Sequence, residues 1–176
     1  MVKVLKLLAY MLFFVLALVY FIPKDSVYYY AENQLKLHKI ILSQEEIVEN
    51  KFSLDINNAE LLYSEIESAQ VENINLKFFL VYNSINVENI TLSEMANSFV
   101  PTQIQTLHVE YTIFNPLSVR LNAVGDFGEI DASFNILDTN ATAILIPSKI
   151  MLQKYKKSLR YFKKNENGEY QYDKTF

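Results

Sequence analysis

The sequence predicts a mainly β protein of the α+β class. It combines an N-terminal transmembrane helix, an antiparallel twisted β-sheet or β-groove domain, and a C-terminal amphipathic helix. Three observations lead to this prediction. An uncharged apolar run fills residues 7–22, apolar and polar side chains alternate from residue 52 onward, and a three- to four-residue apolar spacing follows residue 148.

Residues 1–23 are predicted to form a short cytoplasmic tail and a transmembrane signal anchor. The run LLAYMLFFVLALVYFI has no charge, glycine or proline. At about 1.5 Å per residue, residues 7–22 cover about 24 Å, and residues 4–22 approach the roughly 30 Å of a hydrocarbon core. The side chains predicted to form the anchor are Leu7, Leu8, Phe13, Phe14, Leu16, Leu18, Phe21 and Ile22.

Lys3 and Lys6 predict the orientation of this helix. Basic residues on the short N-terminal side keep that end in the cytoplasm, so the rest of the chain is expected across the membrane. Two alternatives remain. Cleavage of a signal peptide is disfavoured because residues 20–23 are large or rigid, and a core helix of a soluble protein is the other reading.

Residues 24–36 are predicted to form a juxtamembrane helix that Asp25 or Ser26 caps. The β-rich domain then occupies residues 37–176 and begins with a strand at 37–42. Ser43 with Glu46 three residues later is typical of a capping box, so we expect one or two helical turns that end by Asn50.

The middle of the chain reads as a β-meander. Phe52, Leu54 and Ile56 alternate with polar residues, and residues 59–66 and 69–80 are the next predicted strands. The pattern of residues 71–76, VENINL, recurs sixteen residues later as VENITL, with a turn expected at residues 82–84.

The later strands are predicted at residues 103–114, 117–124, 129–137, 141–146 and 170–172. The clearest hairpin joins 117–124 to 129–137 through the turn Gly125, Asp126, Phe127 and Gly128. Asp126, Phe127 and Gly128 also match the metal-binding triplet of protein kinases. The other kinase motifs are absent, so we interpret the triplet as a turn.

Charge is distributed unevenly. Residues 40–148 hold three basic and fifteen acidic residues, whereas residues 149–176 hold eight basic and three acidic ones. The acidic sheet argues against direct nucleic acid binding. Six basic side chains on a predicted helix at 148–164 could contact an anionic surface, namely Lys154, Lys156, Lys157, Arg160, Lys163 and Lys164. The simpler alternative is that they are only solvated while the apolar stripe packs on the sheet.

The sequence shows no assembled catalytic or metal site. The chain has no cysteine, and its two histidines, His38 and His108, lie outside any ligand or triad pattern. We therefore predict a protein that is not an enzyme and that needs no cofactor or metal.

The chain resembles the small inner-membrane accessory proteins of bacterial type II secretion and transformation (DNA-uptake) systems, and above all the type II secretion protein N family. The segments that carry the resemblance are residues 21–24, 58–66, 82–83, 125–128, 146–148 and 168–172.

This resemblance implies a single-pass protein of the bacterial inner membrane, with its N-terminus in the cytoplasm and its β-domain in the periplasm. The implied function is that of a structural or assembly component of the secretion or DNA-uptake machinery, whose other membrane or periplasmic components would be its partners beside membrane lipid. The alternative is a lipid-binding or lipid-transfer protein. In that case a β-groove would hold a bound lipid among Phe52, Leu54, Phe78, Val109 and Ile144.

Overall fold

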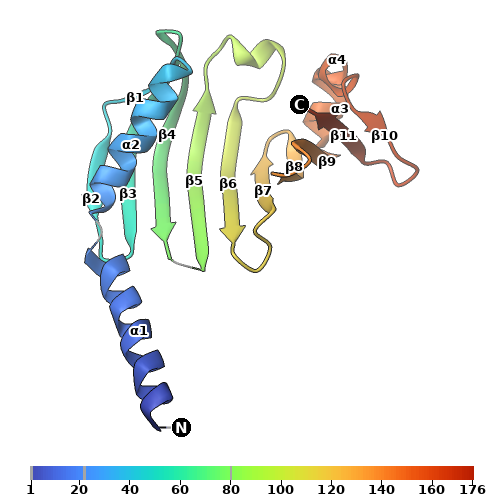
Figure 1. Cartoon of the computed structure of the whole chain (residues 1–176). Helices are drawn as coiled ribbons and strands as arrows, with labels where there is room; N and C mark the ends of the chain where they lie inside the picture. Colours follow the sequence, from blue (N-terminus) through green and yellow to red (C-terminus); the bar gives the residue numbers. More distant parts are fainter. Residues whose placement is uncertain (1, 22, 80) are drawn as a thin grey trace.

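The computed structural model describes residues 2–21, 23–79 and 81–176, and over these residues the chain is mainly β. A single antiparallel sheet of eleven strands forms the body, and helices lie at its two ends (Figure 1). The predicted mainly β class is therefore confirmed. Across the same residues, no helix combines the length and the apolarity that a membrane crossing requires.

The helices and strands follow one another along the chain with few long connections. The helices are α1 (Val2–Phe21), α2 (Lys24–Leu37), the 3₁₀ turn η1 (Ala96–Ser98), α3 (Lys149–Lys154) and α4 (Lys156–Leu159). The strands are β1 (Ile40–Ser43), β2 (Glu46–Glu49), β3 (Ser53–Tyr63), β4 (Ile66–Phe78), β5 (Tyr82–Leu92), β6 (Gln103–Thr112), β7 (Ser118–Gly125), β8 (Gly128–Asn135), β9 (Asn140–Pro147), β10 (Lys163–Lys164) and β11 (Tyr170–Thr175).

The sheet is a meander in which β3 to β9 pair in chain order, and β11 then adds to β9. Strands β1 and β2 both pair with β3 and together make one edge. The repeated segments at 71–76 and 87–92 are neighbours in β4 and β5, with Val71 opposite Ile90 and Ile74 opposite Val87. The repeat is therefore two paired strands of the meander.

The register places nearly all apolar side chains on one face, which we call the inner face. Successive side chains of a strand point to opposite faces, so cross-strand partners form rows. One inner row runs Leu54, Leu76, Ile85, Val109, Leu121, Ala132, Ala143 and Tyr172. On the outer face, the neighbouring row runs Asp55, Asn75, Asn86, His108, Asn122, Asp131, Ile144 and Gln171.

Helix α2 covers the inner face at the β1–β4 end of the sheet. Tyr28 is buried there beside Leu54 and Ile56 of β3. The predicted caps Asp25 and Ser26 do not cap this helix, since Pro23 is the N-cap residue and makes no side-chain cap bond. Instead, the Glu49 carboxylate of β2 accepts from the Lys24 backbone N–H at 3.1 Å, which satisfies a free helix-terminal donor.

Helices α3 and α4 cover the opposite end of the inner face. Met151 and Leu159 are buried against Ala123, Phe127 and Leu145. The Ser148 hydroxyl accepts from the Met151 backbone N–H at 3.1 Å, so the predicted start of this helix is confirmed.

The continuous helix predicted over 148–164 is wrong, because two short helices and the strand β10 replace it. Tyr155 leaves helical geometry, with φ −115° and ψ 27°. Its hydroxyl donates to Asn97 Oδ1 at 2.7 Å, and the Ser158 hydroxyl donates to the Phe99 carbonyl at 2.5 Å. These bonds to the β5–β6 connection redirect the chain at the point where a regular helix would have continued.

Two other local predictions are also wrong. Residues 46–49 form a strand rather than a helix, because Gln44 takes φ 61° and Ile47 then packs in the core under β2–β3 pairing. The turn expected at 82–84 lies earlier in the chain, and these residues belong to β5, where Asn83 pairs with Phe78. Tertiary pairing overrides the local sequence signal in both cases.

We expect Leu54→Ala to destabilise the protein by about 2–5 kcal/mol, the usual cost of truncating a buried leucine. Leu54 is fully buried in the core under α2, beside Tyr28 and Ile56. The measurement is urea unfolding of the full chain in detergent, followed by circular dichroism. Leu37→Ala is the matched control, since Leu37 is 75% exposed and should change the unfolding free energy little. Equal effects of the two variants would contradict this packing.

Candidate functional site

The inner face is covered at both ends and open in the middle. The core under α2, with Tyr28, Leu54 and Ile56, is the first core, and the core under α3 and α4, with Phe127 and Met151, is the second. Ile104 and Leu107 of β6 pack against both cores. Val109 follows Leu107 by two residues, on the same face of β6 and nearer the β6–β7 turn. It belongs to neither core and remains half-buried. Over the middle strands the cores therefore close the half of the inner face far from α1, and they leave an apolar trough around Val109 in the half near α1.

The first part of the trough is a hollow of about 280 Å³ between α2 and the sheet. Val27, Tyr28 and Ala31 of α2 form one wall. The floor comes from β4, β5 and β6 and includes the apolar side chains of Leu76, Phe78, Ile85 and Val109. Ile85 is 40% exposed although it lies at the centre of the sheet.

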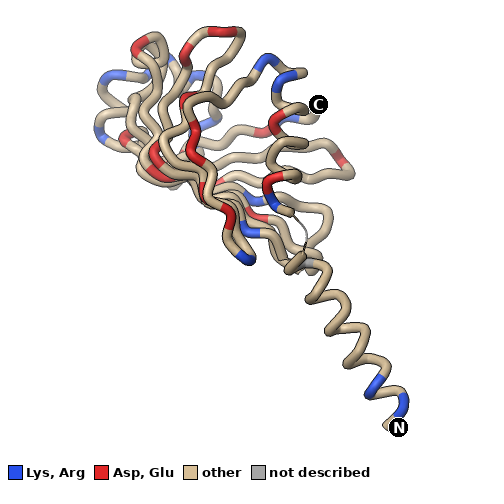
Figure 2. Tube along the Cα trace, turned by 90° about the vertical axis from the view of Figure 1, so that its left-hand side faces the viewer, with Lys and Arg blue, Asp and Glu red and all other residues tan. Residues whose placement is uncertain are grey.

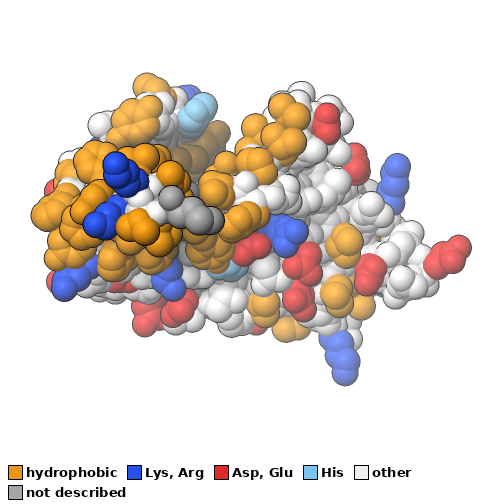
Figure 3. Space-filling model, turned by 60° about the horizontal axis from the view of Figure 1, so that its bottom comes forward, with side chains coloured by type: hydrophobic (Ala, Val, Ile, Leu, Met, Phe, Trp, Pro, Cys, Tyr) orange, Lys and Arg blue, Asp and Glu red, His pale blue; other side chains and the backbone are white. Residues whose placement is uncertain are grey.

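The second part is a hollow of about 330 Å³ on the other side of Val109, which lines both. Its apolar lining comes from β6 to β9 and β11, with Val119, Leu121, Ala132, Phe134, Ala141, Ala143 and Tyr172. Seen from the α1 end, the molecule is hollowed between the lobe that carries α1 and the rest of the sheet, and hydrophobic side chains lie on both sides of this hollow (Figure 3). Pockets for small ligands are usually apolar concavities of roughly this size.

Of the groove residues predicted from the sequence, Phe78 and Val109 line the trough. Leu54 lies on the same face but is buried in the core. Ile144 is on the outer face, and Phe52 lies just before β3, 40% exposed. The α2 wall was not predicted from the sequence. Its signal was the four-residue spacing of Val27, Ala31 and Leu35 on a helix that reads as polar overall.

Tyr28 brings one polar group to the trough. Its hydroxyl donates to Glu45 Oε1 at 3.0 Å, which ties α2 to the β1–β2 connection. Burial raises the pKa of the Tyr28 hydroxyl well above its ordinary value, and the Glu45 carboxylate raises this pKa further by accepting the hydrogen bond and by repelling a phenolate. The phenol is therefore held neutral and α2 is held in place.

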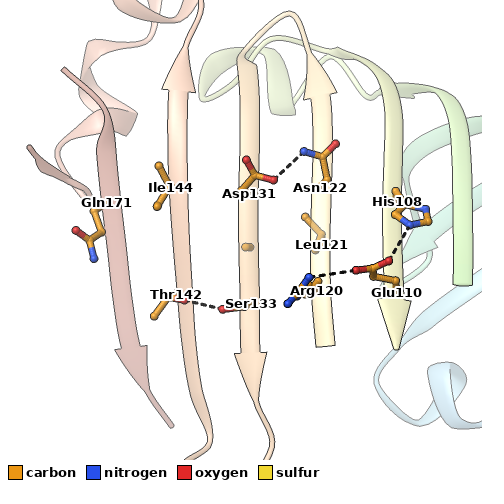
Figure 4. Close-up of a pocket in the computed structure, with 11 residues that line it drawn as sticks. His108, Glu110, Arg120, Leu121, Asn122, Asp131, Ser133, Thr142, Ile144 and Gln171 are labelled. Carbon is orange, nitrogen blue, oxygen red and sulfur yellow. Dashed lines mark hydrogen bonds and ion pairs between the residues drawn. The ribbon is translucent and has the colours of Figure 1, made fainter. Parts of the chain in front are cut away.

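The outer face carries a separate hollow, of about 510 Å³, over β6 to β9 and β11 (Figure 4). Its side chains pair with one another. Glu110 lies 3.7 Å from the His108 imidazole and 3.8 Å from the Arg120 guanidinium, and Asn122 donates to Asp131 at 2.9 Å.

This outer hollow shows no catalytic arrangement. His108 bonds to Asn86 and faces Glu110, and no activated nucleophile stands beside it. Among the described residues, no three His, Asp or Glu side chains are placed to hold a metal ion. The cross-strand polar pairs suit a solvated sheet face.

The predicted anchor residues lie on α1, which extends away from the sheet (Figure 1). The apolar side chains Leu7, Leu8, Phe13, Phe14, Leu16, Leu18 and Phe21 are 50–76% exposed. Ile22 lies outside the described residues. Apart from the two lysines near its free end, α1 carries no charged residue (Figure 2).

The six predicted basic residues are exposed on α3, α4, β10 and the residues between them. These elements lie at the far end of the sheet from α1 (Figure 1). A membrane that α1 enters would therefore not be the surface that these six residues face.

The turn at residues 125–128 joins β7 to β8 as predicted. Gly128 has φ 116°, and a Cβ there would lie 2.0 Å from the Ile146 carbonyl oxygen, so only glycine fits. Gly125 does not have positive φ, and Phe127 is buried in the second core. The turn is therefore structural, and its Phe127 belongs to the core under α3 and α4.

Comparison with known proteins adds no family to this geometry. The chain matches no protein-family model, and neither the curated proteins nor the solved structures give a match.

We expect Tyr28→Phe to change how stability depends on alkaline pH. The folded-state pKa of Tyr28 is raised, so the hydroxyl stabilises the fold fully below about pH 10, the ordinary tyrosine pKa, and less as pH rises above it. Unfolding free energies at pH 7 and pH 11 should differ more in the native chain than in the variant. Tyr30→Phe, at a 68% exposed position of the same helix, is the control. Identical pH slopes for the native chain and Tyr28→Phe would contradict the assignment.

Proposed function

We propose that this protein is held at a membrane by α1 and binds the acyl chain of a lipid in the apolar trough of its sheet. The observation that carries the proposal is the uncovered stretch of inner face around Val109. Burying apolar surface is favourable at about 25 cal/mol per Å². A large apolar concavity left open in a folded domain therefore indicates a ligand or a partner.

A flexible hydrocarbon chain fits the chemistry of this trough. The floor strands are hydrogen-bonded to neighbours on both sides, so their backbones cannot pair with an added peptide strand. The second part of the trough, over β6 to β9 and β11, is lined mainly by valine, alanine and aromatic side chains. Such a surface offers non-directional contacts and few polar groups to fix orientation, which suits an acyl chain.

The membrane anchor is proposed from the exposure of α1 rather than from its length and hydropathy. Most of the described apolar side chains of this helix are at least 50% exposed, and Lys3 and Lys6 stand near its N-terminal end. In water, such a helix would leave a large apolar surface exposed. We place the N-terminus in the cytoplasm and the sheet across the membrane, which is the periplasm if the resemblance to type II secretion protein N holds.

A second candidate function is that of an assembly component of a secretion or DNA-uptake machine. The observation that favours it is the outer face, where polar side chains extend across eight strands and form the hollow around Glu110 and Asp131. A protein partner could dock there with matching polar groups. Crosslinking from Asp131→Cys, in a chain that has no other cysteine, would capture this partner.

We expect Val109→Asn to weaken acyl-chain binding about tenfold or more, since an unpaired amide in an apolar site costs about 1–3 kcal/mol. The measurement is displacement of a fluorescent fatty acid from the purified chain in detergent, with co-purified lipid quantified by mass spectrometry.

The matched control is Val124→Asn, because Val124 lies on the outer face, 38% exposed, opposite Glu129. It should keep the affinity of the native chain, and thermal melting should show that both variants fold. Native-like binding by Val109→Asn, or purified protein without any bound lipid, would remove the acyl-chain proposal.

We expect the double variant Leu12→Asp with Phe13→Asp to leave the membrane fraction. Each acidic residue at a helix centre costs about 2.5–3.5 kcal/mol of insertion. The measurement is retention of the chain in membranes washed with alkaline carbonate. The control is Tyr30→Asp with Leu37→Asp, two exposed positions on α2, which should stay bound.

Protease added to the outside of spheroplasts should digest the sheet, and protection of the sheet would reverse the proposed orientation.

A further inference from the structure

Three turns at the α1 end of the sheet expose large apolar side chains. They lie before β3, between β4 and β5, and between β6 and β7, at the end of the sheet from which α1 extends (Figure 1). We call them the apolar rim. Its side chains and their exposed fractions are Phe52 at 40%, Phe79 at 40%, Val81 at 45%, Ile113 at 48%, Phe114 at 85% and Leu117 at 43%.

The rim is continuous with α1. Tyr20 of α1 meets the Phe52 ring edge-on at 6.1 Å between centroids, and Phe52 stacks on Phe79 at 5.5 Å. Lys51 lies 5.9 Å from the centre of the Tyr20 ring. Aromatic side chains with an adjacent lysine are typical of the interface between water and lipid.

Hydrogen bonds hold the rest of the rim in place. The Val81 carbonyl accepts from the Ile113 backbone N–H at 3.2 Å and from the Thr112 hydroxyl at 3.1 Å. The Phe114 backbone N–H donates to the Thr112 hydroxyl oxygen at 3.3 Å, and Ser118 N–H donates to the Asn115 carbonyl at 3.2 Å. The side chain of Phe114 is thus exposed by an ordered turn.

The three rim turns carry little charge, and the neighbouring β8–β9 turn at the same end adds Asp138 beside the exposed Ile136 and Leu137. The described residues of the three rim turns include no Asp or Glu, and Lys51 is their one charged residue. At the other end, the β3–β4 turn is Ser64 and Glu65, and the β7–β8 turn buries Phe127. A surface with exposed aromatic side chains and little charge suits the bilayer interface.

We propose that the apolar rim lies in the bilayer interface beside α1, so that the trough opens directly onto lipid. This inference rests on the proposed membrane anchor and deepens the proposed binding site. Phe78 and Tyr111, which line the trough, stand immediately before the rim turns. A lipid could then move its acyl chain from the bilayer into the trough without exposing the hydrocarbon to water, which is unfavourable.

Single tryptophans test this arrangement, because the chain contains none. Phe114→Trp reports on the rim, Phe13→Trp on α1, and Phe99→Trp on the opposite end, where Phe99 is 68% exposed. The full chain is reconstituted in phosphatidylcholine vesicles with brominated acyl chains. We expect blue-shifted and strongly quenched emission from Phe114→Trp and Phe13→Trp, with a loss several-fold larger than that of Phe99→Trp.

The outcomes separate the rim from the anchor. Quenching of Phe13→Trp alone overturns the rim and leaves the anchor standing. Quenching of Phe114→Trp alone overturns the anchor, and with it the position of the rim beside α1. Quenching of neither variant overturns both, and so does emission that is blue-shifted but insensitive to bromine, which would mean that protein, such as a second copy, covers these side chains. A cooperative thermal unfolding transition of each variant verifies that it folds.

Discussion

The structure depends on one constraint: a wide antiparallel sheet with a single apolar face has to bury that face. Cross-strand register aligns the apolar side chains from Leu54 to Tyr172 in continuous rows. Among the described residues, three helices cover parts of these rows. Helix α2 serves one end, α3 and α4 serve the other, and the two cores meet over Leu107. Beyond that residue the covering elements diverge, and the face remains open around Val109.

The open part of the face is placed where a membrane-bound ligand could use it. The trough lies in the half of the sheet near α1, and the three rim turns at that end expose six large apolar side chains and one charged residue, Lys51. The closed half is fixed by Ser148, whose hydroxyl donates to the Asp126 carbonyl at 2.5 Å, and by the contacts of Tyr155 with the β5–β6 connection. Helix α1, the rim and the trough thus share one end of the molecule, and the basic residues of α3 and α4 lie at the other.

The outer face follows a different rule. Its side chains pair across strands, as Asn75 does with Asp55 at 2.6 Å and Asn73 with Asn57 at 2.9 Å. These pairs satisfy polar groups without needing a cover, so the outer face can meet solvent or a polar partner. The sheet therefore separates two kinds of surface by its two-residue periodicity alone.

The sequence by itself determined the mainly β class, the meander, the hairpin at residues 125–128 and the candidate groove residues Phe78 and Val109. These features follow from local periodicity and turn chemistry, which each strand carries in its own residues. Only the tertiary structure decided that α2 forms a wall of the trough, that the basic segment breaks at Tyr155, and that residues 46–49 form a strand. Each of these depends on partners distant in the chain, such as Glu45 for Tyr28, Asn97 for Tyr155 and β3 for Ile47. Such contacts leave no signal in the local pattern, because their free energy appears only when the chain has folded.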